Sequence, residues 1–141
     1  MGNLSFFLKE NVEQVENEKV VVSKRFRGAD GKAVPFEIKA ITTAEDDAIR
    51  KKCTKRVPIA GKRNQFTQEF DSNGYLLELT AACVVYPDLK SKELQDSYGV
   101  RGEAAVLGTM LTAGELGVLA EKVQEINGFN SFDELVEEAK N

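Results

Sequence analysis

The spacing of apolar residues changes near residue 42, from every second residue to every third or fourth. Before this point two runs alternate apolar and polar positions, which is typical of half-buried β-strands. One face of the first run carries Val20, Val22 and Phe26, and one face of the second carries Val34, Phe36, Ile38 and Ala40. The segment 28–31 between them, Gly-Ala-Asp-Gly, has the composition of a hairpin turn. The pattern therefore predicts a β-hairpin over residues 20–41.

The apolar faces of the two runs also predict how they pair. A two-residue loop at Asp30 and Gly31 would place Phe26 opposite Pro35, on a different face from Phe36. An odd loop of three or five residues places Phe26 opposite Phe36. Burial of one face favours the odd loop, because a shift of one residue turns every side chain to the other face. We therefore expect the rings of Phe26 and Phe36 to be close cross-strand neighbours packed on the helices.

From residue 42 onward the pattern predicts five or six short helices. Three begin with a capping box, in which a Ser or Thr and a Glu three residues later satisfy free N–H groups. These boxes are Thr42 with Glu45, Thr112 with Glu115, and Ser131 with Glu134. The expected helices cover residues 42–54, 71–86, 91–98 and 103–111, then one from 112 to Gly128 and one from 131. Residues 57–68 contain Pro58 and Gly61 and are expected to form a loop.

The helix predicted over residues 71–86 is apolar around most of its circumference, with Glu78 as its only charged interior residue. Such a helix is typical of the centre of a fold, so Leu77, Ala81 and Val84 should be among the most buried residues. Because the strands precede the helices, the fold class is α+β, an N-terminal β-hairpin followed by a helical bundle. We expect a single domain over residues 1–141. It divides into an apolar peptide and acidic linker (1–19), the hairpin (20–41) and the bundle (42–141).

The composition excludes most enzyme classes. The 141 residues include no His, which removes serine triads and histidine-based zinc sites. The paired carboxylates, such as Asp46 and Asp47, lie among polar neighbours, and Cys53 and Cys83 lie on predicted core faces, where thiols are inert. We therefore expect no enzymatic activity, no metal and no cofactor. The longest uncharged run, residues 104–114, is too short to span a membrane, and the start of the chain lacks a signal-peptide core, so we expect a cytoplasmic protein.

The charge distribution is uneven. The net charge is −4, yet residues 50–63, the basic island, contain seven basic side chains and no acid. These are Arg50, Lys51, Lys52, Lys55, Arg56, Lys62 and Arg63. Three interpretations remain open: cations that favour a helix C-terminus, a nucleic-acid contact, or a contact with an acidic protein. Nucleic acid is disfavoured, because the island lacks interleaved aromatic residues and the rest of the chain is acidic.

A short apolar peptide, Phe6, Phe7 and Leu8, lies before the acidic linker. It could fold back onto the core or dock on a partner, since an exposed pair of Phe residues is disfavoured unless it is used. We therefore take Phe6, Phe7 and Leu8, together with Arg50, Lys51, Lys55, Arg56, Lys62 and Arg63, as the candidate partner-binding residues.

The whole chain resembles the XkdN-like tail assembly chaperones of PBSX-type prophages. The resemblance is carried by a series of short strings in order. They are residues 6–11 (FFLKEN), 23–26 (SKRF), 37–41 (EIKAI), 52–58 (KCTKRVP), 94–100 (LQDSYGV), 110–112 (MLT), 122–125 (KVQE), 127–129 (NGF) and 135–141 (LVEEAKN). None of these strings carries a known catalytic residue or binding motif.

The resemblance implies a non-enzymatic chaperone, made in the bacterial host, that binds the tape measure protein before the tail tube polymerises around it. It implies the tail tube protein as a second candidate partner, and absence from the mature virion. Two alternatives stay open: a small phage-encoded nucleic-acid-binding regulator that uses the basic island, and a structural tail component retained in the virion. Salt-sensitive binding to DNA would identify a nucleic-acid-binding regulator. A protein inventory of purified particles would identify a structural tail component.

Overall fold

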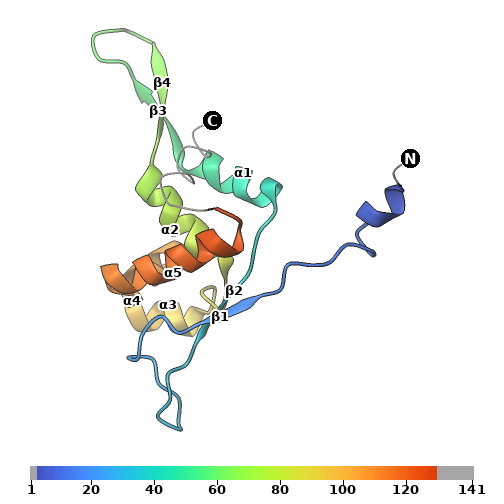
Figure 1. The fold of residues 1–141 in the computed structure, drawn as a ribbon. Helices are drawn as coiled ribbons and strands as arrows, with labels where there is room; N and C mark the ends of the chain where they lie inside the picture. The colour runs from blue at the N-terminus through green and yellow to red at the C-terminus, as the bar shows by residue number, and fades with distance from the viewer. Residues whose placement is uncertain (1–2, 130–141) are drawn as a thin grey trace.

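The computed structural model describes residues 3–129 and has an α+β fold, as the sequence predicts (Figure 1). A 3₁₀ turn, η1 (Leu4–Phe7), precedes the strands β1 (Glu18–Val20) and β2 (Phe36–Ile38). The rest comprises α1 (Thr43–Lys52), β3 (Thr54–Pro58), β4 (Phe66–Phe70), α2 (Ser72–Cys83), β5 (Val84–Tyr86), α3 (Lys92–Tyr98), α4 (Glu103–Met110) and α5 (Ala113–Ile126). Strands thus also occur among the helices, where the sequence pattern did not predict them.

The N-terminal hairpin forms, but its predicted register is wrong. Val20 lies opposite Phe36 in an antiparallel ladder, and an isolated bridge joins Arg27 to Ala33 around a five-residue loop. Between these two pairings the chain leaves the ladder and turns at residues 24–25. This detour brings Phe26 back over Phe36, with ring centroids 5.7 Å apart. The expected closeness of the two rings is therefore confirmed, although it comes from a turn and not from direct cross-strand pairing.

The predicted helix over residues 71–86 is too long at its C-terminus. Helix α2 ends at Cys83, and the next three residues form β5, which pairs antiparallel with β2 in a sheet of order β1-β2-β5. The Lys39 N–H donates to the Cys83 carbonyl at 2.9 Å, which fixes this junction. Val-Val-Tyr is a sequence with strong strand preference, and the free edge of β2 supplies hydrogen bonds that a further helical turn would lose.

The loop predicted over residues 57–68 is also wrong. Strands β3 and β4 pair antiparallel from Thr54 with Phe70 to Pro58 with Phe66, and they project from the body as a two-stranded hairpin (Figure 1). Most of its side chains are exposed on both faces. Its two strands contain β-branched and aromatic residues, and the Arg56 guanidinium lies 4.0 Å from the centroid of the Phe66 ring. These contacts stabilise a hairpin that no other described element covers.

Helix α2 occupies the centre of the fold, as predicted, and packs against α1, α4 and α5. Its fully buried side chains include Tyr75, Leu79 and Cys83. Ala81 is buried as expected, whereas Leu77 and Val84 are only half-buried, so the prediction is wrong for these two residues. When a helix is apolar on all sides, its sequence does not indicate which side the neighbouring helices cover.

Two predicted capping boxes are present, because the side chains of Thr42 and Thr112 accept from the N–H groups of Glu45 and Glu115. Helix α1 ends at Lys52, two residues earlier than expected. Helix α3 ends as predicted at Gly99, whose φ of 68° is left-handed. The third box, at Ser131, lies outside the described residues.

An ion pair joins the N-terminal turn to the start of α5. The Arg25 Nε donates to Glu115 Oε2 at 2.9 Å, and this partner holds the pKa of Glu115 well below its ordinary value of 4.5. A carboxylate with a lowered pKa stabilises the folded state above its ordinary pKa, and this stabilisation is lost as the pH falls.

We therefore expect Glu115→Gln to lower stability at pH 7, with a deficit that shrinks progressively as the pH falls below about 4.5. The glutamine keeps an oxygen for the capping box but loses the charge. Urea unfolding of both proteins across this pH range measures the difference, and a deficit that does not change with pH would contradict the assignment.

Candidate interaction surfaces

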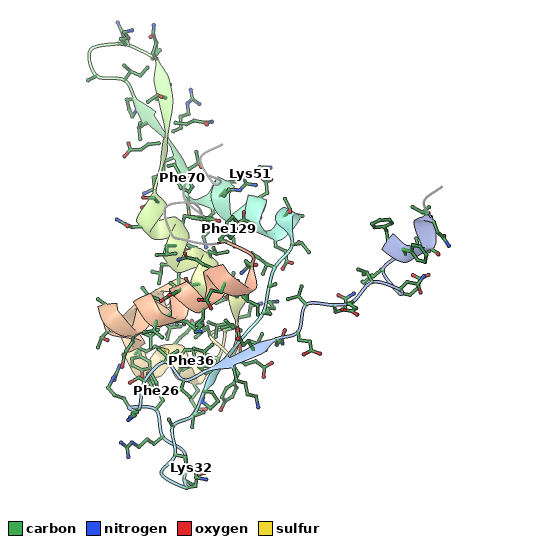
Figure 2. All side chains as sticks on the ribbon, viewed as in Figure 1. Phe26, Lys32, Phe36, Lys51, Phe70 and Phe129 are labelled. Carbon is green, nitrogen blue, oxygen red and sulfur yellow. The ribbon has the colours of Figure 1, made fainter. Side chains whose placement is uncertain are left out.

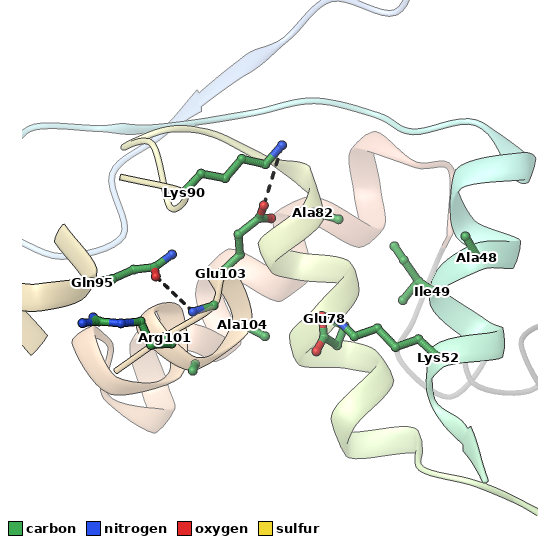
Figure 3. A pocket seen from close by; sticks show the side chains of 12 residues that line it. Ala48, Ile49, Lys52, Glu78, Ala82, Lys90, Gln95, Arg101, Glu103 and Ala104 are labelled. Atoms are coloured by element: carbon green, nitrogen blue, oxygen red, sulfur yellow. Dashed lines mark hydrogen bonds and ion pairs between the residues drawn. The ribbon is translucent and has the colours of Figure 1, made fainter. Parts of the chain in front are cut away.

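A groove with a cavity volume of about 660 Å³ lies between α1, α2 and the N-terminal part of α4 (Figure 3). Its floor consists mainly of small apolar side chains, and we call it the alanine groove. The floor residues are Ala48, Ile49, Ala82, Ala104 and Ala105. Small side chains on three neighbouring helices leave room that larger ones would fill.

Charged side chains line the rim of the alanine groove in pairs. Lys52 Nζ lies 3.1 Å from a Glu78 carboxylate oxygen, and Lys90 Nζ lies 3.8 Å from a Glu103 oxygen (Figure 3). Arg101 also borders the groove. The groove therefore has an apolar floor and a rim that carries both signs of charge, which suits an amphipathic helix better than a small charged ligand.

The structure divides the basic island into two parts. At the end of α1, Arg50 Nη2 lies 3.3 Å and Lys51 Nζ 3.2 Å from Asp47 oxygens, while Lys52 pairs with Glu78. These cations also suit the negative end of the helix. The other four residues, Lys55, Arg56, Lys62 and Arg63, lie exposed on the β3–β4 hairpin. The hairpin is thus the part of the island that is open to a partner.

The apolar peptide at the N-terminus does not fold back onto the body in this structure. Phe6 and Phe7 lie in η1 and are 70% and 78% exposed, and Leu8 follows at 40%. The segment stands away from the helices on an extended stretch of chain (Figures 1 and 2). The peptide, the basic hairpin and the alanine groove are therefore three separate surfaces.

Sequence reasoning missed the alanine groove. Ala82 and the adjacent Ala104 and Ala105 are visible in the sequence, but helical periodicity marks them only as small apolar positions. Whether a small side chain lines a groove or fills a helix crossing depends on which helices are neighbours. Here α2 packs against both α1 and α4, and the hollow lies between those two contacts.

Burial restricts the chemistry of the two cysteines. Cys53 and Cys83 are both free and buried, and burial raises the pKa of the Cys83 thiol to about 11. Within residues 3–129 no group of three His, Cys, Asp or Glu side chains could hold a metal ion. No helix in the described part of the chain is both long and apolar enough to cross a membrane.

A profile of the phage XkdN-like tail assembly chaperones matches residues 4–140. The chain belongs to this family. Among curated relatives of this XkdN-like chaperone, the phage-like element PBSX protein XkdN of Bacillus subtilis strain 168 is 33% identical over 141 residues. The match covers 99% of this chain and 94% of that protein. The uncharacterized protein YqbN of the same strain is 35% identical over 141 residues. This match covers 99% of this chain and 93% of YqbN.

The fold of this XkdN-like chaperone is also found in a crystal structure of YqbN. The two structures superimpose with a TM-score of 0.77 at 32% sequence identity. The match covers 92% of this chain and 99% of the YqbN chain. The arrangement described above is therefore shared by a solved relative over nearly its whole length.

Proposed function

We propose that this protein is a non-enzymatic chaperone that binds the tape measure protein in the cytoplasm of the bacterial host and is absent from the mature virion. The family membership supports a function in tail assembly. The observation that carries the finer proposal is the alanine groove, an open hollow lined by small apolar side chains and bordered by paired charges. The tail tube protein is a second candidate partner.

The physical need for such a chaperone follows from the shape of its proposed substrate. A long amphipathic chain without its tube exposes a continuous apolar stripe and would aggregate. The alanine floor lets the backbone of a partner helix approach closely, while the paired rim charges can contact its polar flanks. Because polymerising tube subunits must displace the chaperone, a modest affinity per copy is required, and a small groove provides it.

The sequence-derived candidate residues can add to this contact. Phe6, Phe7 and Leu8 expose apolar surface, and Lys55, Arg56, Lys62 and Arg63 present charge on a projecting hairpin. Arg50 and Lys51 are engaged by Asp47 and would contribute less. Rim charges of this kind raise the rate and specificity of association more than its strength.

Co-expression with the tape measure protein should increase the soluble fraction of that protein severalfold. The variant Ala105→Arg should abolish this gain, because Ala105 is an exposed residue of the groove floor and an arginine there fills the hollow. Val118→Arg is the control, since it adds the same side chain to an exposed position of α5 that does not line the groove. Sedimentation of lysates followed by quantitative blotting measures the soluble fraction.

Unchanged tape measure solubility on co-expression with the unaltered protein would overturn the proposed function. A full gain with Ala105→Arg would overturn only the groove as its site. Salt-sensitive binding to DNA would favour the nucleic-acid-binding alternative. Stoichiometric recovery of this protein in purified particles would favour the structural alternative.

A further inference from the structure

A second hollow, separate from the alanine groove, lies at one end of the three-stranded sheet. It has a cavity volume of about 210 Å³ and is lined by side chains from β2, β5, α3 and α4. An apolar cavity of about 150 Å³ holds one benzene molecule, so this hollow has room for a phenyl ring. Nine of the described residues line it, and none of the nine is charged. We call it the aromatic pocket, because four of them are aromatic, namely Phe26, Phe36, Tyr86 and Tyr98.

The N-terminal arm, residues 3–17, carries two phenyl rings that the described part of the chain leaves largely exposed, those of Phe6 and Phe7. Within residues 3–129, every hydrogen bond of residues 3–12 has both partners inside that segment. Residues 13–16 form no backbone hydrogen bond with the described chain. The arm is therefore a preformed turn on a linker that can swing about its attachment to β1.

The root of the arm lies on the side of the sheet from which the pocket can be reached. Asn17 Nδ2 donates to Glu37 Oε2 at 3.0 Å, which holds the root against β2. Glu37 is the cross-strand partner of Tyr86 on β5, and directly paired residues share a face of a sheet. Tyr86 lines the aromatic pocket and is 55% exposed. The arm is thus attached one strand away from a wall of the pocket.

The linker is long enough to bring the phenyl rings to the pocket of their own chain. From Glu18 the pocket lies across β2 and β5 and a few residues along them, a path of about 15 Å. Residues 9–17 span up to about 30 Å when extended. A short flexible link gives an effective concentration in the millimolar range, so even weak docking within one chain is populated.

We propose that the N-terminal arm is a strap that closes over its own sheet and seats the phenyl ring of Phe7 in the aromatic pocket. Phe7 is the more exposed of the two Phe residues and the nearer to the linker. The structure shows the open position, in which the arm stands away from the sheet (Figure 1). Closure covers the ring and the pocket together, which reduces the apolar surface of the free chaperone. A partner for the apolar peptide must then open the strap, which lowers its apparent affinity by the open fraction.

Closure needs no tail protein, so it is tested on the isolated chain and independently of the proposed function. Met110 lines the aromatic pocket, and the chain has one other methionine, Met1. NMR of isotope-labelled methionine methyl groups therefore reports on the pocket, because the ring current of a seated phenyl ring shifts the Met110 signal. Phe7→Leu should move this signal, whereas Phe6→Leu, the same change at the neighbouring residue, is the matched control and should leave it in place.

The dependence on protein concentration distinguishes closure within one chain from contact between copies. The difference between the Met110 signals of the unaltered protein and of Phe7→Leu should stay the same on dilution, because strap and pocket belong to one molecule. A Met110 signal that does not move in Phe7→Leu, or a difference that disappears on dilution, would overturn the proposal.

A tryptophan in the arm gives a second readout, since the chain contains no Trp and Phe7→Trp places a single indole there. Adding Tyr86→Arg puts a charge beside the pocket and should make acrylamide quench this indole at least about threefold more strongly, because the strap then opens. Val118→Arg is the control, because it adds the same side chain to an exposed position of α5 that does not line the pocket. It should leave the quenching of Phe7→Trp unchanged. Equal quenching with and without Tyr86→Arg would overturn the proposal.

Discussion

Replacement of Phe36 by alanine is expected to lower the free energy of unfolding by about 4 kcal/mol, the range for loss of a buried aromatic side chain. Phe36 is 2% exposed and lies in β2, the middle strand of the sheet, so its removal leaves a cavity that neighbouring side chains cannot fill. Phe26 contacts the same ring from the turn but is only half-buried. The change Phe26→Ala should therefore cost only about 2 kcal/mol.

Urea unfolding followed by circular dichroism measures the free energy of unfolding of both variants. Because each variant loses one phenyl ring, the comparison controls for the general effect of that loss. A cost for Phe26→Ala equal to or above that of Phe36→Ala would contradict the register in which Val20 lies opposite Phe36. It would favour the simple ladder in which the two rings are direct cross-strand partners.

Leu79→Ala is expected to cost about 3 kcal/mol, because Leu79 is 1% exposed and lies at the centre of α2. Leu77→Ala removes the same atoms from the same helix and is the matched control. Leu77 is half-buried, and one of its methyl carbons would lie 3.4 Å from a Cβ placed on Gly108 of α4. Its replacement should cost only about 1 kcal/mol, since water already reaches part of the side chain.

The ratio of the two costs tests the rotation of α2 about its axis. Equal costs would mean that α2 does not present the face carrying Leu79 to the core, and would contradict the full burial of Leu79. Both variants keep the helix propensity high, so changes in helix formation contribute little to either value.

The elements that the sequence predicted correctly are those whose signals are local. The capping boxes at Thr42 and Thr112 and the glycine at position 99 act within one helical turn, so their residues alone mark where a helix begins or ends. The ion pair of Asp47 with Lys51 on α1 is equally local, because the two residues are four apart, although the sequence analysis did not predict it. The α+β class followed from the order of such signals along the chain, and the family from the resemblance of short strings over its whole length.

Three features depended on which segments became neighbours. Residues 84–86 continue an apolar helix by pattern, but they form β5 because β2 offers an unpaired edge beside them. The hairpin β3–β4 has mostly exposed side chains, so no buried face imposes an alternating apolar pattern on it, and the sequence suggested a loop instead. The detour before Phe26 likewise depends on contacts with distant residues, including the ion pair of Arg25 with Glu115.

The candidate surfaces divide in the same way. The chain itself determines that residues 50–63 are basic, that residues 10–18 are acidic, and that Phe6 and Phe7 lie apart from any long apolar run. Only the tertiary structure decided that part of the basic island is neutralised on α1 while the rest projects on a hairpin, and that four alanines line one groove. Charge is a property of each side chain, whereas a groove exists only where packed helices leave space between them.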